Sequence, residues 1–137
     1  MNNYFDDKRP PQTTPDMENS PDNQRQSALE TIVEHAPDAV FLVDALGANH
    51  FRFVQSNRQH ELLTGISPDT IRGRTPHEVP GGKRGDAAAF YFETCRENHR
   101  RVEYEETVDL PDGVKTFHTV LNPVVKNGAV LLNGSKS

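Results

Sequence analysis

The sequence predicts a domain of the α+β class, with an antiparallel β-sheet and short helices between its strands. Two stretches with strand character lie near the start of the domain and three lie at its end, and capped helical segments separate the two groups. The strongest turn signal is Asn127-Gly128, a pair that favours a tight β-hairpin. Strands that follow one another through such turns pair antiparallel, so the predicted sheet has five antiparallel strands.

The composition excludes several classes of protein. The chain has 137 residues, which suits one modest core, and its net charge is −5. This mild acidity argues against a nucleic-acid partner and against binding to an anionic membrane surface. The sequence contains no apolar run that could cross a bilayer and no apolar core of a secretion signal near its start. Its single cysteine, Cys95, precludes an internal disulfide, and we expect a cytoplasmic location.

Three regions are predicted along the chain. Residues 1–26 are rich in Asn, Asp, Gln, Pro and Ser, and we expect a flexible leader there. Ser27 and Glu30 form a capping box that predicts the start of a helix. We therefore place the folded domain at residues 27–134 and a short tail at residues 135–137.

The five predicted strands have alternating or branched apolar sequences. They are residues 39–44, 50–55, 101–110, 114–125 and 129–134. The turn Pro111-Asp112-Gly113 separates the third strand from the fourth. The residues expected to be largely buried are Phe41, Val43, Phe53, Leu62, Leu63, Phe92, Tyr104, Phe117, Leu121 and Leu131.

Capping signals predict short helices in the middle of the chain. Asn57 can cap a first helix, which Gly65 would end. Ser67-Pro68 marks a second helix, which ends before Gly73. The segment Thr75–Glu78 is a capping box with proline at the first helical position, and it predicts a third helix start.

A longer helix is expected after these. Pro80–Gly85 reads as a loop, and Asp86 can cap the helix that follows it. The apolar stripe of this helix consists of Ala88, Tyr91, Phe92 and Cys95.

Several stretches, taken together, resemble the PAS domain family. Glu34–Asp44, with its Ala-Pro-Asp step, resembles the opening helix-to-strand junction of the family. The stretch Gln55–Gly65 resembles the family's asparagine-led helix ending in Thr-Gly, and Ile71–Thr75 resembles its glycine step. The stretch Glu105–Pro123 resembles its central hairpin, and Asn127–Gly134 resembles its last hairpin. The resemblance covers about residues 27–134 and rests on the order and spacing of these pieces.

The resemblance implies a five-stranded antiparallel sheet with short helices packed on one face and a small pocket beneath them. It also implies a sensory function in signal transduction, in which the domain binds a small molecule or a partner and relays a signal to an effector. Sensor histidine kinases of two-component systems are one such setting. The alternative is a PAS-fold module that binds no ligand and acts through dimerisation or protein contacts. A third reading, a small enzyme on an α+β scaffold, needs an acid in a deep apolar pocket, which the sequence does not mark, so we expect no enzyme.

The candidate pocket residues are Phe53, Asn57, Leu62, Tyr91, Phe92, Cys95, Glu106 and Phe117. Glu106 is unusual because strand alternation places it on the same face as Tyr104 and Val108. It marks either a polar wall of the pocket or a bulge that shifts the register of the strand. No catalytic residues are assigned.

The cofactor is left unknown, but the resemblance argues against two pigments. Haem-binding relatives use a histidine on or near the long helix, where this chain has only His99, close to the C-terminal end. Light-sensing relatives carry a reactive cysteine in the segment that corresponds to Gly73–Glu78, which has none. Metal-ligand spacings of His and Cys are also absent. We therefore predict a colourless protein without a metal site, and His77 or His99 would be the first ligands to test if colour were found.

The first predicted helix carries an apolar stripe of Leu29, Ile32 and Val33. A short helix that precedes the sheet cannot bury such a stripe by itself. We expect a homodimer or a contact with a partner domain through these residues. The competing possibility is a monomer in which the helix folds back over its own sheet.

Overall fold

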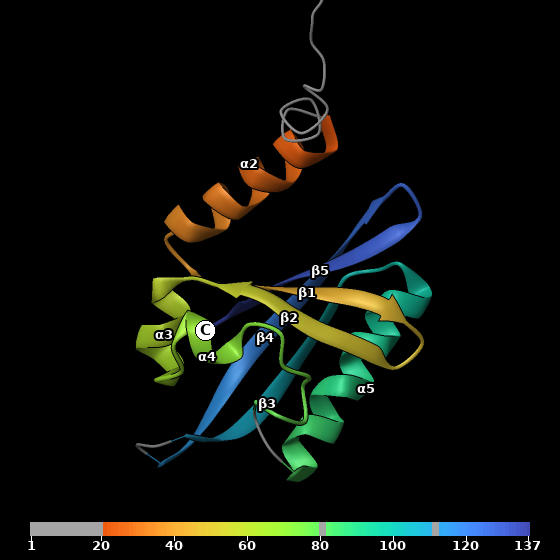
Figure 1. The fold of residues 1–137 in the computed structure, drawn as a ribbon. Helices are drawn as coiled ribbons and strands as arrows, with labels where there is room; N and C mark the ends of the chain where they lie inside the picture. Colours follow the sequence, from red (N-terminus) through yellow and green to blue (C-terminus); the bar gives the residue numbers. More distant parts are fainter. Residues whose placement is uncertain (1–20, 80–81, 111–112) are drawn as a thin grey trace, which may run out of the picture. The chain divides into compact units, whose positions relative to one another are not determined.

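The computed structural model describes residues 21–79, 82–110 and 113–137 (Figure 1). The chain consists of two compact units, Met1–Ile32 and Val33–Ser137, and the whole sheet lies in the second. The elements in order are α2 (Pro21–His35), β1 (Ala39–Gly47), β2 (His50–Ser56), α3 (Arg58–Thr64), α4 (Pro68–Ile71), α5 (Gly82–Asn98), β3 (Val102–Leu110), β4 (Gly113–Lys126) and β5 (Ala129–Lys136).

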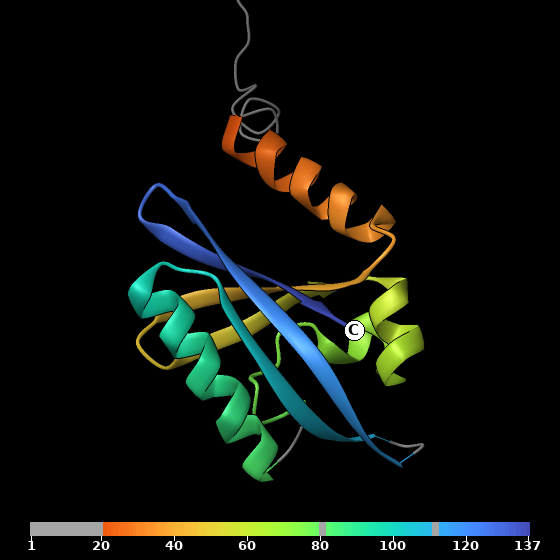
Figure 2. The ribbon, with the colours of Figure 1, turned by 180° about the vertical axis from the view of Figure 1, so that it is seen from behind.

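The sheet has five antiparallel strands in the order β2-β1-β5-β4-β3. The last strand of the chain therefore lies at the centre, where it joins the β1–β2 pair to the β3–β4 pair. Helices α3, α4 and α5 lie on one face of this sheet (Figures 1 and 2). The predicted fold class is confirmed, and each predicted strand coincides with an observed one to within a few residues.

The hairpin between β4 and β5 forms at the predicted turn. Asn127 and Gly128 both have positive φ, 52° and 81°, as a two-residue type I′ turn requires. Pro111 and Asp112 of the other predicted turn lie outside the described residues, and Gly113 after them has a φ of 123°.

Strand β5 extends past residue 134, where the sequence predicted its end. Ser135 and Lys136 pair with β1, and the backbone of Ser137 exchanges two hydrogen bonds of 2.9 Å with His118. The expected tail is therefore part of the sheet. This extension brings the side chain of Lys136 into the interior, where its exposed fraction is 11%.

The helix starts differ from the sequence prediction in two places. Helix α2 begins at Pro21, so Ser27 is not its cap. Residues 21–26, which the sequence assigned to the flexible leader, are therefore helical. The rest of the expected leader, residues 1–20, lies outside the described residues. Helix α5 begins at Gly82, within the segment predicted as a loop.

Tertiary packing explains the early start of α5. A Cβ atom on Gly85 would lie 2.5 Å from the Cα atom of His77, so this turn of the helix packs directly against the preceding turn of chain. Asp86 lies inside the helix rather than at its cap, and its Oδ1 lies 2.5 Å from His77 Nε2. The loop and cap predicted here were wrong because the contact, rather than local propensity, sets the helix start.

The other capping signals are confirmed. Asn57 caps α3, which ends at Gly65 with a φ of 79°, and Ser67 caps α4. Thr75 and Glu78 form both hydrogen bonds of a capping box, of 2.8 and 3.3 Å. The backbone there makes a single turn rather than a helix.

Most of the predicted core is buried, with three exceptions. Leu62 has an exposed fraction of 61%, and Leu63 and Leu131 are only half-buried. His60 and Leu132 are fully buried in their place. The register of the β4–β5 hairpin turns residues 132, 134 and 136 toward the helices, which places Leu131 on the opposite face.

Asn57 ties the beginning of the sheet to helix α3. Its Oδ1 accepts hydrogen bonds of 3.0 Å from the backbone N–H groups of Val40 and His60. Its Nδ2 donates to the carbonyl oxygens of Val33, at 3.0 Å, and Asp38, at 2.7 Å. All these contacts are made by one buried amide, so its loss leaves several backbone groups without partners.

We predict that Asn57→Ala lowers the free energy of unfolding by about 2–4 kcal/mol, since it removes a helix cap and leaves the N–H of Val40 unsatisfied in the interior. Urea unfolding measures this change. The control is Arg58→Ala, on the exposed neighbour in α3, which should cost less than about 0.5 kcal/mol. Equal stability of the Asn57 and Arg58 variants would contradict the prediction.

Candidate functional site

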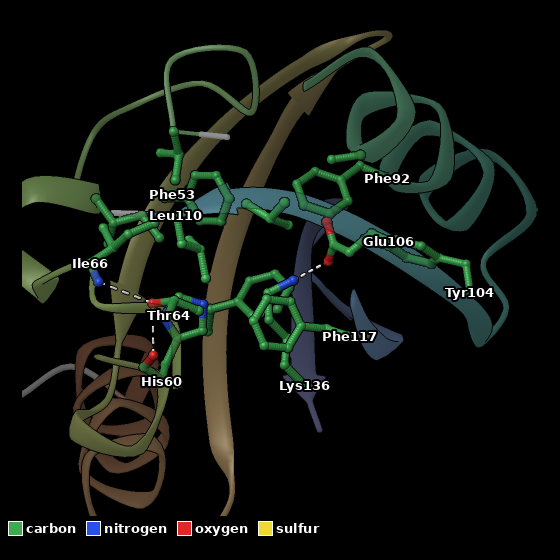
Figure 3. Close-up of a pocket in the computed structure, with 15 residues that line it drawn as sticks. Phe53, His60, Thr64, Ile66, Phe92, Tyr104, Glu106, Leu110, Phe117 and Lys136 are labelled. Carbon is green, nitrogen blue, oxygen red and sulfur yellow. Dashed lines mark hydrogen bonds and ion pairs between the residues drawn. The ribbon is translucent and has the colours of Figure 1, made fainter. Parts of the chain in front are cut away.

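A cavity with a volume of about 40 Å³ lies between the sheet and helices α3, α4 and α5. This volume holds about three water molecules. Its walls are mainly apolar and aromatic, with residues from every strand of the sheet. Figure 3 shows labelled side chains of α3, β3, β4 and β5 converging on this space.

One wall carries a buried ion pair between the β3 and β5 strands. Lys136 Nζ contacts Glu106 Oε2, and the two side chains have exposed fractions of only 11% and 8%. Thr119 Oγ1, on β4 between them, donates to Glu106 Oε2 at 2.7 Å and accepts from Lys136 Nζ at 3.3 Å. Three neighbouring strands thus supply one polar side chain each to a single cluster.

Aromatic rings surround the ammonium group of Lys136. Its Nζ lies 5.1 Å from the ring centroid of Phe41 and 5.7 Å from that of Phe117, within the range of cation–π attraction. The Phe41 ring lies over Gly134, where a Cβ atom would overlap it. Glycine at this position of β5 therefore allows Phe41 to pack close to the ion pair.

Burial and local charge set the protonation states in the cavity. Burial lowers the pKa of Lys136, and the neighbouring Glu106 carboxylate opposes this shift. Burial lowers the pKa of His60 to about 3, with a further contribution from the positive charge of Lys136. His60 is therefore neutral at physiological pH. Burial, together with the charge of Glu106, raises the pKa of Tyr104, so this side chain is neutral as well.

His60 also has a polar atom that lacks a partner. Its side chain is buried with an exposed fraction of 2%, and Nδ1 has no hydrogen-bond partner among the described residues. Thr64, one turn later on α3, donates its hydroxyl to the backbone oxygen of His60 at 2.8 Å. The ring of His60 lines the cavity, and buried polar atoms are rarely left unpaired, so this nitrogen is a candidate hydrogen-bonding position for a bound molecule.

Four of the predicted pocket residues line the cavity: Phe53, Phe92, Glu106 and Phe117. The β3–β4 register is continuous from Val102 to Leu110, so strand alternation without a bulge turns Glu106 inward.

The structure places the other four predicted pocket residues outside the lining. The side chain of Asn57 is engaged in the junction described above, and Leu62 is exposed on the outer side of α3. Tyr91 stacks on Tyr104 with ring centroids 4.0 Å apart. Cys95 is buried in the core, and burial raises the pKa of its thiol to about 11, so it behaves as a small apolar residue.

Sequence reasoning missed His60 and Lys136 as cavity residues. The spacing from Asn57 to His60 and then to Thr64 follows one face of a helix, and this could have identified His60. Lys136 lies four residues after Leu132 on β5, so alternation turns both side chains to the same face of the sheet. The predicted strand ended two residues too early to include Lys136.

The histidines singled out as possible metal ligands lie elsewhere. His99 ends α5 with a φ of 51°, and its N–H donates to the carbonyl of Cys95 at 3.0 Å. His77 is on the surface with Asp86. No group of three or more His, Cys, Asp and Glu side chains suited to a metal ion occurs in the described ranges.

Of the helices that the structure describes, none has the length and hydropathy needed to span a bilayer.

The strand order, the helices over one face and the cavity beneath them define the PAS architecture. The PAS fold family model matches residues 27–133, and the chain belongs to this family. PAS domains are sensory modules of signalling proteins. No curated protein matches the sequence significantly.

Similar solved structures show the same fold at low sequence identity. A PAS domain from Colwellia psychrerythraea is 17% identical, with a TM-score of 0.64 over 83% of this chain and 94% of that chain. The LOV protein of Rhodobacter sphaeroides is 16% identical, with a TM-score of 0.68 over 83% of this chain and 66% of that chain. The LOV domain of a blue-light activated histidine kinase from Erythrobacter litoralis is 20% identical, with a TM-score of 0.60 over 75% and 96%.

Proposed function

We propose that this chain is a sensory PAS domain that binds a small molecule in the cavity between the sheet and helices α3, α4 and α5. The observation that supports this proposal is the buried cluster of Glu106, Lys136 and Thr119 in an otherwise apolar wall. Ligand sites commonly combine apolar walls with a few polar groups that orient the ligand. Lys136 lies on the central strand, so a molecule that contacts it acts on the strand that joins the two halves of the sheet.

The proposed setting is a cytoplasmic signalling protein in which the domain relays occupancy of the cavity to an effector, such as the kinase of a two-component system. A catalytic role is not part of the proposal. Glu106, the one carboxylate that lines the cavity among the described residues, is engaged by Lys136 and Thr119.

Native mass spectrometry of protein purified without denaturation tests the binding function. We expect a population heavier than the bare chain by the mass of one small molecule, which is released on unfolding. Ala88→Val, which narrows the cavity, should reduce this population, whereas Ala87→Val on the exposed side of α5 should not. A bare mass for the wild type under gentle conditions would contradict small-molecule sensing.

The cavity is too small for a flavin or a haem, each of which has tens of non-hydrogen atoms. We therefore predict that purified protein shows no absorbance band in the visible region. An absorbance spectrum measured before and after addition of each pigment checks this. A flavin or Soret band that co-elutes with the folded protein would show that the cavity opens far beyond its present volume.

A second candidate function is association through α2, and the exposure of Ile32, at 66%, favours it. Large apolar side chains left on a surface often mark a contact with another chain. Val33, with an exposed fraction of 2%, is buried, so the proposed contact surface consists of Leu29 and Ile32.

We predict that the wild type associates to a dimer as its concentration rises, and that Ile32→Asp remains monomeric because a carboxylate would be buried at the contact. Sedimentation velocity over a concentration series measures both. Leu46→Asp, which changes an exposed leucine on β1, is the matched control and should associate like the wild type. Identical sedimentation of the wild type and the Ile32 variant would exclude this helix as the contact.

A further inference from the structure

We propose that the cavity selects a small, electrically neutral molecule with a short apolar chain and one hydroxyl or primary amide group, which bonds to His60 beside the Glu106–Lys136 pair. This inference rests on the proposed function and specifies the chemical class of the ligand. Three features of the cavity support it: its balanced charge, its size and its unsatisfied hydrogen-bonding nitrogen.

The charge of the cavity wall is already balanced. Glu106 and Lys136 are the only charged side chains among the described residues that line it, and they neutralise each other. A carboxylate or ammonium group brought into this space would add a net charge to a buried site, which is strongly unfavourable unless a new partner compensates it. A neutral ligand avoids this cost and leaves the ion pair intact.

The size and the walls of the cavity limit the ligand to a few non-hydrogen atoms with an apolar chain. A volume of about 40 Å³ suits a chain of a few carbons. Phe53, Ile71, Phe92 and Phe117 supply apolar contacts for this chain. A rigid ring system or a phosphorylated ligand would not fit without displacing these side chains.

His60 Nδ1 provides the hydrogen bond that selects the polar group. It is buried without a partner, and the imidazole is neutral, so Nδ1 is either a donor or an acceptor according to its tautomer. A hydroxyl and a primary amide can each donate and accept a hydrogen bond, so either satisfies both tautomers. A plain hydrocarbon would leave the nitrogen unsatisfied.

Four probes with one four-carbon chain test the class: 1-butanol, butyramide, butyrate and butylammonium. Each is titrated at pH 7 into isotopically labelled full chain, and methyl and imidazole ¹⁵N shifts are followed by NMR. We expect saturable shifts of Ile71 and His60 with butanol and butyramide, at millimolar or tighter affinity. Butyrate and butylammonium should bind at least tenfold more weakly.

Two alanine variants on neighbouring positions of α5 locate the binding. Ala88 lines the cavity, so Ala88→Val should weaken butanol binding at least tenfold. Ala87 is exposed, so Ala87→Val, with the same change in helix propensity, should bind like the wild type. A weakening of equal size in both variants would place the probe outside the cavity and overturn the inference.

The remaining outcomes separate this inference from the proposed function. Tighter binding of butyrate or butylammonium than of butanol would overturn the neutral class while leaving a small-molecule site. Failure of all four probes, with a retained ligand in native mass spectrometry, would do the same. Failure of all four with a bare native mass would overturn the proposed function as well.

Discussion

Replacement of Lys136 by methionine is expected to lower the free energy of unfolding by about 3–5 kcal/mol at pH 7, because it leaves the carboxylate of Glu106 buried without its partner. Methionine keeps most of the volume of the lysine stem, so packing against Phe41 and Phe117 changes little. Urea unfolding at equilibrium measures the difference.

The double variant Lys136→Met with Glu106→Gln distinguishes loss of the pair from loss of packing. A neutral amide removes the unpaired charge, so the double variant should recover much of the stability lost in the single one. Lys115→Met, at an exposed position of β4, is the surface control and should change stability by less than about 0.5 kcal/mol. If Lys136→Met were as stable as the Lys115 variant, the buried pair would not hold β5 in the way inferred here.

The second large effect is a dependence of stability on pH that arises from His60. Its pKa is about 3 in the folded domain, whereas an unfolded chain gives histidine a pKa of about 6.5. Between these values the unfolded state binds a proton that the folded state does not, so stability falls as the pH is lowered through this window. The slope due to this group is about 1.4 kcal/mol for each pH unit.

His60→Gln should remove this slope, because glutamine does not titrate. We expect urea midpoints measured from pH 7 to pH 4 to fall less steeply for this variant than for the wild type. His50→Gln, which changes an exposed histidine, is the control and should follow the wild type. Parallel curves for the wild type and the His60 variant would show that His60 takes up protons in the folded state.

The sequence determined the features that depend on neighbouring residues. Asn57 and Gly65 cap the two ends of α3, and Asn127-Gly128 forms a tight turn, because each depends on backbone and side-chain groups within a few residues. Alternation within β3 likewise placed Glu106 on the inner face. Together with the resemblance to the PAS family, these local signals predicted the fold class, the strands and half of the candidate pocket residues.

Only the tertiary structure decided where helix α5 begins and which residues of α3 and β5 face inward. Gly85 packs against His77, and this contact extends the helix into a glycine-containing segment that local propensity disfavours. The anchor at Asn57 turns His60 inward and leaves Leu62 exposed, although leucine is the more apolar of the two.

The β1–β2 pair adds a similar case. Leu42 pairs with Gln55 and Val43 with Phe53, so Val54 is an extra residue that shifts the register. This bulge breaks the simple alternation expected for β2, and nothing within that segment alone marks its position.

The polar cluster of the cavity depends on tertiary structure most of all. Glu106, Thr119 and Lys136 are separated by 13 and 17 residues along the chain and meet because β4 lies between β3 and β5 in the sheet. A lysine next to the last residue of the sequence has no local signal for burial, and lysine is almost never fully buried unless it is paired. Its burial depends on a carboxylate from another strand, and that pairing is fixed by the strand order rather than by the sequence around either residue.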